Sequence, residues 1–179
     1  MKNICIIVLG IVLIFSVITT AFSADVVLDN GGVTFSPPAG FSEMPVDVVR
    51  KKYPNENRPQ YLYGNEDYSV SIGVKFTENL LEINELRNLK MMMEDTLPRV
   101  IPNLEWISRR IMEINKRKWL LLELKSSAID ADIHNIMLST SYKGKMLSFN
   151  FNSTVEQFKK NQKKLLNSIF SIKINENAP

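Results

Sequence analysis

Residues 139–158 read STSYKGKMLSFNFNSTVEQF, with two runs of alternating polar and apolar residues separated by Lys143-Gly144. If Lys143-Gly144 forms a two-residue hairpin turn, the large apolar side chains of the two runs lie opposite one another on one face of a sheet. The expected pairs are Tyr142 with Lys145, Thr140 with Leu147, Leu138 with Phe149 and Ile136 with Phe151. A shift of one residue would place Leu138 opposite Ser148 and divide the apolar set between two faces. We therefore predict this hairpin and register, with the asparagines of the second run on the other, more polar face.

A helix is expected directly after the hairpin. Ser153, with Glu156 three residues later, has the spacing of a capping box, in which the serine accepts a hydrogen bond from the amide of Glu156. An apolar stripe then continues to about Asn167; its members are Val155, Phe158, Leu165, Leu166 and Ile169. A last strand is expected over residues 170–174.

A second hairpin is expected upstream, with strands over residues 104–114 and 117–124 joined by Asn115-Lys116. A two-residue turn here pairs Met112 with Trp119 and Glu113 with Lys118. The run Trp119-Leu120-Leu121-Leu122 is apolar on both faces, which is typical of a central strand that is covered on both sides. The pattern therefore predicts helices on both faces of one sheet.

The front half of the chain supplies the remaining elements. Short strands are expected over residues 25–29, 32–36 and 60–63, a short helix over 45–53 and a half-buried strand over 70–76. A longer helix is expected over Leu80–Leu97, with Asn79 and Glu82 as its capping box and Pro98 at its end.

The triplet Met91-Met92-Met93 in this helix suggests either a soft-metal site or an adaptable docking surface. Adjacent residues of a helix point about 100° apart, so three consecutive methionines cannot converge on one ion. We therefore interpret the triplet as filling of the hydrophobic core.

The first 23 residues have the layout of a secretory signal peptide. A basic start at Lys2 precedes an apolar run from Ile4 to Ile18, and small residues follow up to Ser23. A membrane-spanning helix needs about 20 apolar residues, which this run does not reach, so we expect cleavage after Ser23 rather than a retained anchor. The prediction is a signal peptide over 1–23 and a single domain over 24–179, secreted or periplasmic.

Composition excludes several chemistries for the mature domain. Cys5 is the only cysteine and lies inside the leader, so disulfides, thiolate nucleophiles and cysteine-ligated metals are not expected. Removing Lys2 with the leader lowers the formal net charge from +3 to +2, which is too small to indicate a nucleic-acid partner. Glycine-rich phosphate loops and metal-ligand spacings do not occur, so we expect no cofactor and no enzyme.

Several motifs resemble those of the PsbP-like, Mog-type superfamily, including its exported DcrB-like members. In the front half these are FSPPAGF (35–41), KYP (52–54) and YGNEDYSV (63–70); in the back half they are EINKRKW (113–119), TSYKGK (140–145), FNF (149–151) and SI (168–169). Lys116 and Lys143 depart from the pattern, because glycine and asparagine are usual at these two turns. The resemblance implies an α+β fold, a single-domain α/β/α sandwich on a mainly antiparallel sheet. Members are mostly binding or assembly proteins, and the resemblance supplies no catalytic residues.

The sequence contains a single histidine and one acidic cluster that could form chemical sites. His134 has no serine in a strained nucleophile turn to act on, so we interpret it as a structural residue at a strand end. Asp130 and Asp132, with Glu123 nearby, match no calcium loop and read as a turn between strands. We expect no catalytic and no metal site.

Four lysines, Lys159, Lys160, Lys163 and Lys164, share one flank of the last helix. They form either a solvated flank or a docking surface for an acidic protein or anionic lipid head groups. We expect a non-enzymatic binding or assembly protein of the cell envelope whose partner is another protein. The alternative is a lipid- or small-ligand-binding protein with a pocket between the sheet and the 80–97 helix.

Overall fold

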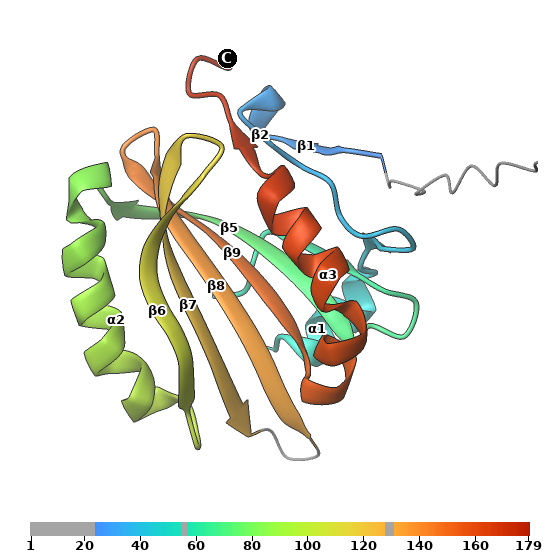
Figure 1. The fold of residues 1–179 in the computed structure, drawn as a ribbon. Coiled ribbons are helices and arrows are strands. Elements are labelled where there is room, and N and C mark those ends of the chain that lie inside the picture. The colour runs from blue at the N-terminus through green and yellow to red at the C-terminus, as the bar shows by residue number, and fades with distance from the viewer. Residues whose placement is uncertain (1–23, 55–56, 128–130) are drawn as a thin grey trace, which may run out of the picture.

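The computed structural model describes residues 24–54, 57–127 and 131–179, so the predicted signal peptide lies outside the described residues. One sheet has seven strands in the order β3-β4-β5-β9-β8-β7-β6, and a smaller sheet has the order β1-β2-β10 (Figure 1). The strands of the large sheet are β3 (Ser42–Glu43), β4 (Tyr61–Gly64), β5 (Val70–Leu80), β6 (Glu105–Ile114), β7 (Arg117–Ser127), β8 (Asp132–Tyr142) and β9 (Lys145–Thr154). The small sheet contains β1 (Val26–Leu28), β2 (Val33–Phe35) and β10 (Lys173–Ile174), and the α-helices are α1 (Val46–Lys52), α2 (Leu86–Val100) and α3 (Val155–Ser171).

The β8–β9 hairpin has the register predicted from the sequence. Leu138 pairs with Phe149 and Ile136 with Phe151, and the turn residues Lys143 and Gly144 have φ angles of 50° and 74°. These left-handed angles are those of the turn type that matches the twist of a two-residue hairpin. A lysine therefore adopts a conformation that asparagine or glycine takes more easily, and the apolar pairing on one face outweighs that cost.

The β6–β7 hairpin is also confirmed. Met112 pairs with Trp119 and Glu113 with Lys118, across a turn in which Asn115 has a φ of 49° and Lys116 one of 66°. Residues 119–122 are all buried, as expected for a strand covered on both sides. β6, β7, β8 and β9 follow one another as neighbours in the sheet, so this half of the molecule is an antiparallel meander.

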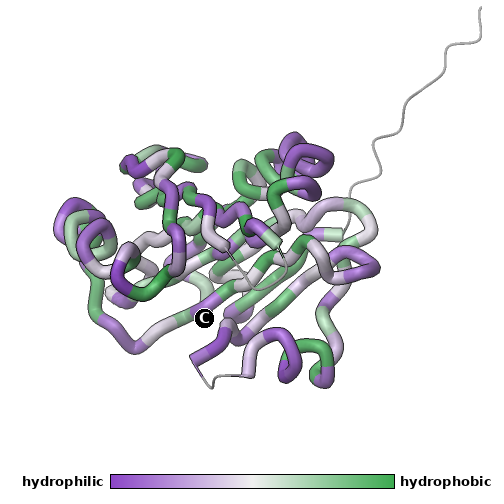
Figure 2. Tube along the Cα trace, turned by 90° about the horizontal axis from the view of Figure 1, so that it is seen from below, coloured by the Kyte–Doolittle hydropathy of each residue, from purple (hydrophilic) through white to green (hydrophobic). Residues whose placement is uncertain are grey.

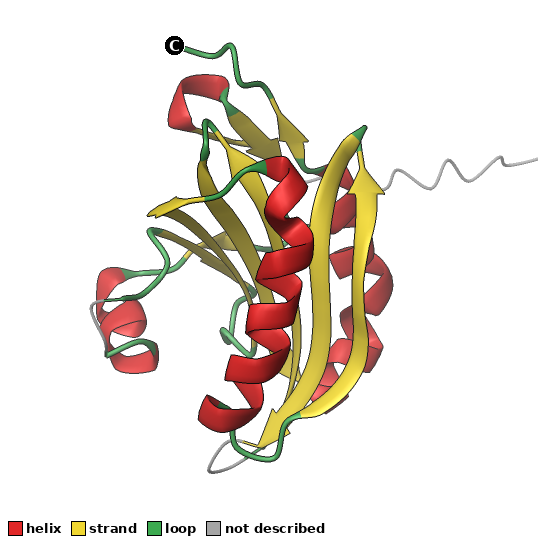
Figure 3. Ribbon diagram, turned by 90° about the vertical axis from the view of Figure 1, so that its left-hand side faces the viewer, coloured by secondary structure: helices red, strands yellow, loops and turns green. Residues whose placement is uncertain are grey.

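Helices cover both sides of the large sheet, which confirms the predicted α+β fold. We call the side covered by α3 the α3 face and the opposite side, on which α2 and α1 lie, the α2 face (Figures 1 and 3). Hydrophobic and hydrophilic residues alternate along the strands and helices (Figure 2). The core on the α3 face includes Phe35, Trp119, Phe149, Phe151, Phe158, Leu165 and Ile169, and the core under α2 includes Leu86, Leu89, Leu97, Leu120, Leu122 and Leu124.

The boundaries of α2 differ from the prediction. β5 continues to Leu80, where that residue pairs with Lys145 of β9, and α2 begins only at Leu86. The capping box is formed by Glu82 and Glu85 rather than by Asn79 and Glu82. At the other end Pro98 lies inside the helix, because a proline removes only its own N–H and the helix still closes with the bond from the Ile101 N–H to the Leu97 carbonyl (2.9 Å).

The interpretation of the methionine triplet as core was wrong for two of its members. Met91 and Met92 are 63% and 56% exposed, whereas Met93 is half-buried and packs against the leucines under α2. Three successive residues span more than half of a helical turn, so one apolar stripe can bury only one of them.

The start of α3 lies one residue later than predicted. The cap is Thr154, the last residue of β9, whose hydroxyl accepts a hydrogen bond from the Gln157 N–H (3.2 Å). Ser153 instead lies within the sheet, paired with Val70 and His134. The helix continues to Ser171, so Phe170 lies in the helix and is exposed rather than in the last strand. The final strand is correspondingly short.

The first half of β5 is buried on both faces, not on one as its alternation suggested. On the α2 face Ser71 lies beside the Tyr53 hydroxyl (3.3 Å), and a Cβ added to Gly73 would lie 2.8 Å from the Pro59 ring. The segment from α1 to β4 therefore covers positions whose small or polar residues suggested an exposed face. Glycine at position 73 is what lets this segment lie so close to the sheet.

Candidate functional site

The α2 face is covered only in part, and a groove remains over its central strands. Its volume is about 400 Å³, and it lies between α2 and the connection from α1 to β4. Its lining includes Met93 from α2, Met137 and Ser139 from β8, and Met146, Ser148 and Asn150 from β9. We call this the open groove. In Figure 3 these central strands lie between the two helices of the α2 face.

Small polar side chains pair with one another across the strands beneath the open groove. The Asn152 amide donates to the Asn135 carbonyl oxygen (2.7 Å), and the hydroxyls of Ser139 and Ser148 lie 3.3 Å apart. The amide oxygen of Asn150 is buried and has no hydrogen-bond partner among the described residues. An unpaired buried acceptor costs free energy, so Asn150 is an unsatisfied polar residue in the lining of the groove.

The charged side chains at the rim of the open groove are already partnered. The Lys75 ammonium donates to the carbonyl oxygen of Asn57 (2.9 Å), and Glu78 forms an ion pair with Lys145. The groove therefore presents mainly thioethers, amides and hydroxyls, together with the Lys75 ammonium, which is hydrogen-bonded to neutral oxygens of Asn57. Sequence alternation placed Asn150 and Asn152 on the polar face, but nothing in the sequence showed that Met137, Met146 and the helix would meet there.

An adjoining hollow of about 340 Å³ contains a polar cluster that joins the small sheet to the β8–β9 hairpin. The Tyr142 hydroxyl donates to the Asp29 carboxylate, and the Lys143 ammonium lies 3.1 Å from the same oxygen. These two hydrogen bonds lower the pKa of Asp29 from its usual value of 3.8, whereas desolvation by burial raises the pKa of Tyr142. A Cβ at Gly32 would lie 1.8 Å from the tyrosine oxygen, so this contact requires glycine there.

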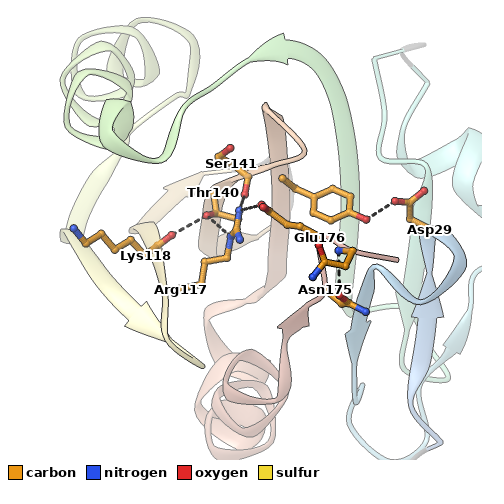
Figure 4. A network of polar contacts seen from close by, with 9 residues as sticks. Asp29, Arg117, Lys118, Thr140, Ser141, Asn175 and Glu176 are labelled. Carbon is orange, nitrogen blue, oxygen red and sulfur yellow. Dashed lines mark hydrogen bonds and ion pairs between the residues drawn. The ribbon is translucent and has the colours of Figure 1, made fainter. Parts of the chain in front are cut away.

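A second polar network ties the C-terminus to both hairpins (Figure 4). The Arg117 guanidinium donates to the Ser141 carbonyl and to the Glu176 carboxylate (2.6 Å). The Asn175 N–H donates to the Gly32 carbonyl (2.8 Å). The network joins β7, β8 and the loop before β2 to the C-terminal residues, so it helps to hold the fold together.

His134 is buried against α3, with 6% of its surface exposed. Its Nε2 lies 2.8 Å from a Glu123 oxygen, and its ring stacks on Phe158 with centroids 3.5 Å apart. Ser153 is its cross-strand partner, and that hydroxyl is buried without a hydrogen-bond partner among the described residues. A histidine packed under a helix cannot meet a substrate, which supports the structural interpretation. The sequence did not indicate the pairing with Glu123.

The other predicted candidates lie apart from the open groove. Asp130 is outside the described residues, and the Asp132 carboxylate accepts from the Ser127 hydroxyl (3.1 Å). Within the described ranges, no three ligand-type side chains come together as a metal site would require. Nor does the described part of the chain contain a helix that is both long and apolar enough to cross a membrane.

The four lysines Lys159, Lys160, Lys163 and Lys164 are all exposed on α3, and Lys160 is paired with Glu156 (2.6 Å). α3 lies on the opposite side of the large sheet from the open groove (Figure 3). The lysine flank and the open groove are therefore two separate candidate surfaces, and docking at the lysine flank stays a prediction.

No protein-family model and no curated protein matches the sequence. Solved structures do match. Cyanobacterial PsbP (CyanoP) from Synechocystis sp. PCC 6803 is 12% identical with a TM-score of 0.59, covering 89% of this chain and 96% of its own. The Ran-binding protein Mog1p of Saccharomyces cerevisiae is 11% identical with a TM-score of 0.53, covering 84% and 94%.

LpqN of Mycobacterium tuberculosis, which is involved in cell envelope biogenesis, is 8% identical with a TM-score of 0.58, covering 84% of this chain and 89% of LpqN. Identities this low establish the fold and leave function to the site itself. The resemblance predicted from the sequence is confirmed at that level: the chain has the PsbP-like, Mog1-type fold.

Proposed function

We propose that this chain is an exported, non-enzymatic protein that binds another protein in the cell envelope or outside the cell. The observation that carries the proposal is the open groove, a concave part of the α2 face between α2 and the connection from α1 to β4. The leader-like residues 1–23 support export, and the similarity in fold to a Ran-binding protein and to an envelope-biogenesis protein supports a binding role.

The chemistry of the open groove suits a polypeptide. Met93, Met137 and Met146 are flexible and polarisable, so they can adapt to the side chains of a partner. The buried oxygen of Asn150 can accept from a backbone N–H once its amide turns toward the groove, and every residue of a partner except proline carries such an N–H. Because most of the lining is thioether, amide or hydroxyl, we expect an extended and largely uncharged segment of the partner in the groove.

Site-specific cross-linking tests this proposal. A photoreactive residue at Met137 should capture one defined protein in the native envelope, whereas the same residue at Lys164 on α3 should not. Binding of that purified partner should then be lost in Met137→Lys, which places a charge in the groove, and kept in the matched control Lys164→Ala.

Capture from Lys164 alone, together with binding that weakens at high salt, would instead support the lysine flank and contradict the groove. Export is tested separately, by sequencing the N-terminus of the native protein. Cleavage as predicted leaves Ala24 as the first residue, and a chain that starts at Met1 contradicts it.

A lipid or another small hydrophobic molecule is the second candidate occupant. The observation in its favour is the size of the open groove, because about 400 Å³ lies within the usual range of about 300–1,000 Å³ for ligand pockets, and three methionines line it. Native mass spectrometry of the protein purified from its own envelope distinguishes the two. A bound small molecule that disappears in Met137→Lys supports the ligand, and an unliganded wild type contradicts it.

A further inference from the structure

β6 is the last strand of the large sheet, and its outer edge has no partner strand among the described residues. It is ten residues long, and Ile107 and Ile111 on it are 47% and 40% exposed. An open edge of this length presents unpaired backbone N–H and C=O groups that favour pairing with another strand.

The turn at Asn115-Lys116 determines which backbone groups point outward. In a two-residue hairpin the pair that flanks the turn, here Ile114 and Arg117, is hydrogen-bonded, and hydrogen-bonded pairs then alternate along the ladder. Ile114, Met112 and Arg110 therefore use their backbone groups on β7. The N–H and C=O groups of Arg109, Ile111 and Glu113 point away from the sheet.

We propose that two copies of this chain pair through β6, antiparallel and centred on Ile111, so that the two large sheets become one. In this register Ile111 lies opposite Ile111 of the second copy, and Arg109 lies opposite Glu113 on both sides of it. All three outward-pointing residues then find backbone partners, and two opposite-charge pairs flank one apolar pair on the same face.

Within the regular part of β6, residues 108–114, the alternative registers lack this complementarity. A register centred on Ile107 would place Glu105 opposite Arg109, but the irregularity between Trp106 and Ser108 interrupts the strand there. Centring the pair on Arg109, Arg110 or Glu113 places like charges directly opposite each other, which is destabilising. Centring it on Met112 places Ile111 opposite Glu113 and forms no ion pair. The sequence of this edge therefore selects one register among those that its backbone allows.

Arg109 is already oriented for the role. Its Nε lies 3.4 Å from a Glu94 oxygen of α2, and its guanidinium lies 5.3 Å from the centre of the Trp106 ring. A guanidinium carries five donors, so these contacts hold the side chain in place and leave donors for a second carboxylate. Holding it in advance lowers the entropic cost of the contact with Glu113 of the second copy.

Charge reversal provides the test, measured by analytical ultracentrifugation over a range of concentrations. Wild type should dimerise, and Glu113→Arg and Arg109→Glu should each raise the dimer Kd by at least about tenfold, because each creates two like-charge pairs. An equimolar mixture of the two variants should dimerise again, since both flanking pairs then have opposite charges. The control Lys164→Glu, on α3, should behave as wild type.

A second measurement is independent of charge. In a Cys5→Ser chain, which has no other cysteine, Ile111→Cys should cross-link two copies under mild oxidation, because Cα atoms in a hydrogen-bonded pair are about 5.5 Å apart. Met112→Cys should not, since the two copies of residue 112 would lie about 8 Å apart, beyond disulfide reach. A wild type that stays monomeric at high concentration, or a mixture of the two reversed chains that does not associate, would overturn the proposal.

Discussion

The same strands form both faces of the large sheet, but their side chains are buried more completely on the α3 face than on the α2 face. On the α3 face Phe149 and Phe151 are buried among aromatic neighbours, with Phe35 and Trp119 in edge-to-face contact with Phe149. On the α2 face the alternate residues of the same strand, Ser148 and Asn150, line the open groove. One strand thus supplies both the main core and the candidate binding surface.

Connectivity explains the difference. α3 follows β9 directly and folds back over the middle of the sheet, so it covers the central strands. α2 connects β5 to the edge strand β6 and lies mainly over β6 and β7, so on β8 and β9 only Met137 and Met146 pack against the leucines under α2, and the neighbouring polar residues line the open groove. The comparison suggests that the α3 face and the leucine core under α2 determine stability, whereas the polar residues of the open groove can change at little cost to the fold.

The largest effect that distinguishes the faces is expected from neighbouring residues of β9. Phe149→Ala should lower the free energy of unfolding by about 3–5 kcal/mol, because it leaves a cavity in the core. Ser148→Ala, on the other face, should lower it by less than about 1 kcal/mol, since its hydroxyl contact is exchanged for water. Urea denaturation of both variants measures the difference, and similar losses in the two would refute the comparison.

A smaller loss in the free energy of unfolding is expected from a substitution where the small sheet meets the β8–β9 hairpin. Gly32→Ala places a methyl group 1.8 Å from the Tyr142 hydroxyl, so the tyrosine must move and its bond to Asp29 breaks. We expect a loss of about 1–3 kcal/mol. In a Tyr142→Phe background the same substitution should cost less, because the hydroxyl is absent. Additive losses in the double variant would show that the two residues do not interact.

On the α2 face a substitution is expected to leave the stability of the protein unchanged or to increase it. Asn150→Leu removes a buried oxygen that has no partner among the described residues, so the free energy of unfolding should stay unchanged or rise by up to about 1 kcal/mol. Thermal unfolding measures it. A loss of more than about 1 kcal/mol would mean that Asn150 supports the fold rather than the groove.

The smallest effect concerns acid stability at Asp29. Its pKa is lowered in the folded state by the bonds from Tyr142 and Lys143, so its contribution is fully present above the unfolded value of 3.8 and is lost as the pH falls through the folded value. Asp29→Asn should therefore be less stable than wild type near neutral pH, with a shallower loss below about pH 3.8. The difference should be small because the carboxylate is 38% exposed. If the stability of both proteins fell equally steeply as the pH was lowered, this assignment would be contradicted.

Local patterns predicted the meander well. The apolar alternation around Lys143-Gly144 and Asn115-Lys116 fixed both registers, because a shift of one residue would reverse every side chain. Helix boundaries were less predictable. The segment around Leu80 could serve as strand or helix, and its pairing with Lys145 of β9 decided for the strand. That pairing joins residues far apart in the chain, so local propensity could not show it.

The candidate site was less predictable than the fold for the same reason. The sequence placed Asn150 and Asn152 on a polar face, but the open groove depends on where α2 and the connection from α1 to β4 lie over the sheet. Met93 lies in the predicted 80–97 helix, whereas Met137 and Met146 belong to strands whose position beneath it depends on the whole sheet. The position of one helix on a sheet is a property of packing, which residue periodicity does not encode.

The small sheet joins the two ends of the described chain, since β2 lies between β1 and β10 and Val33 pairs with Ile174. During synthesis the meander can form from consecutive segments, whereas the second edge of β2 is paired only after Lys173 and Ile174 have been made. A nascent or truncated polypeptide that ends before Lys173 would keep that edge available to other strands. Lys173 and Ile174 therefore cover an edge of β2, and a chain without them would expose that edge to chaperones and proteases.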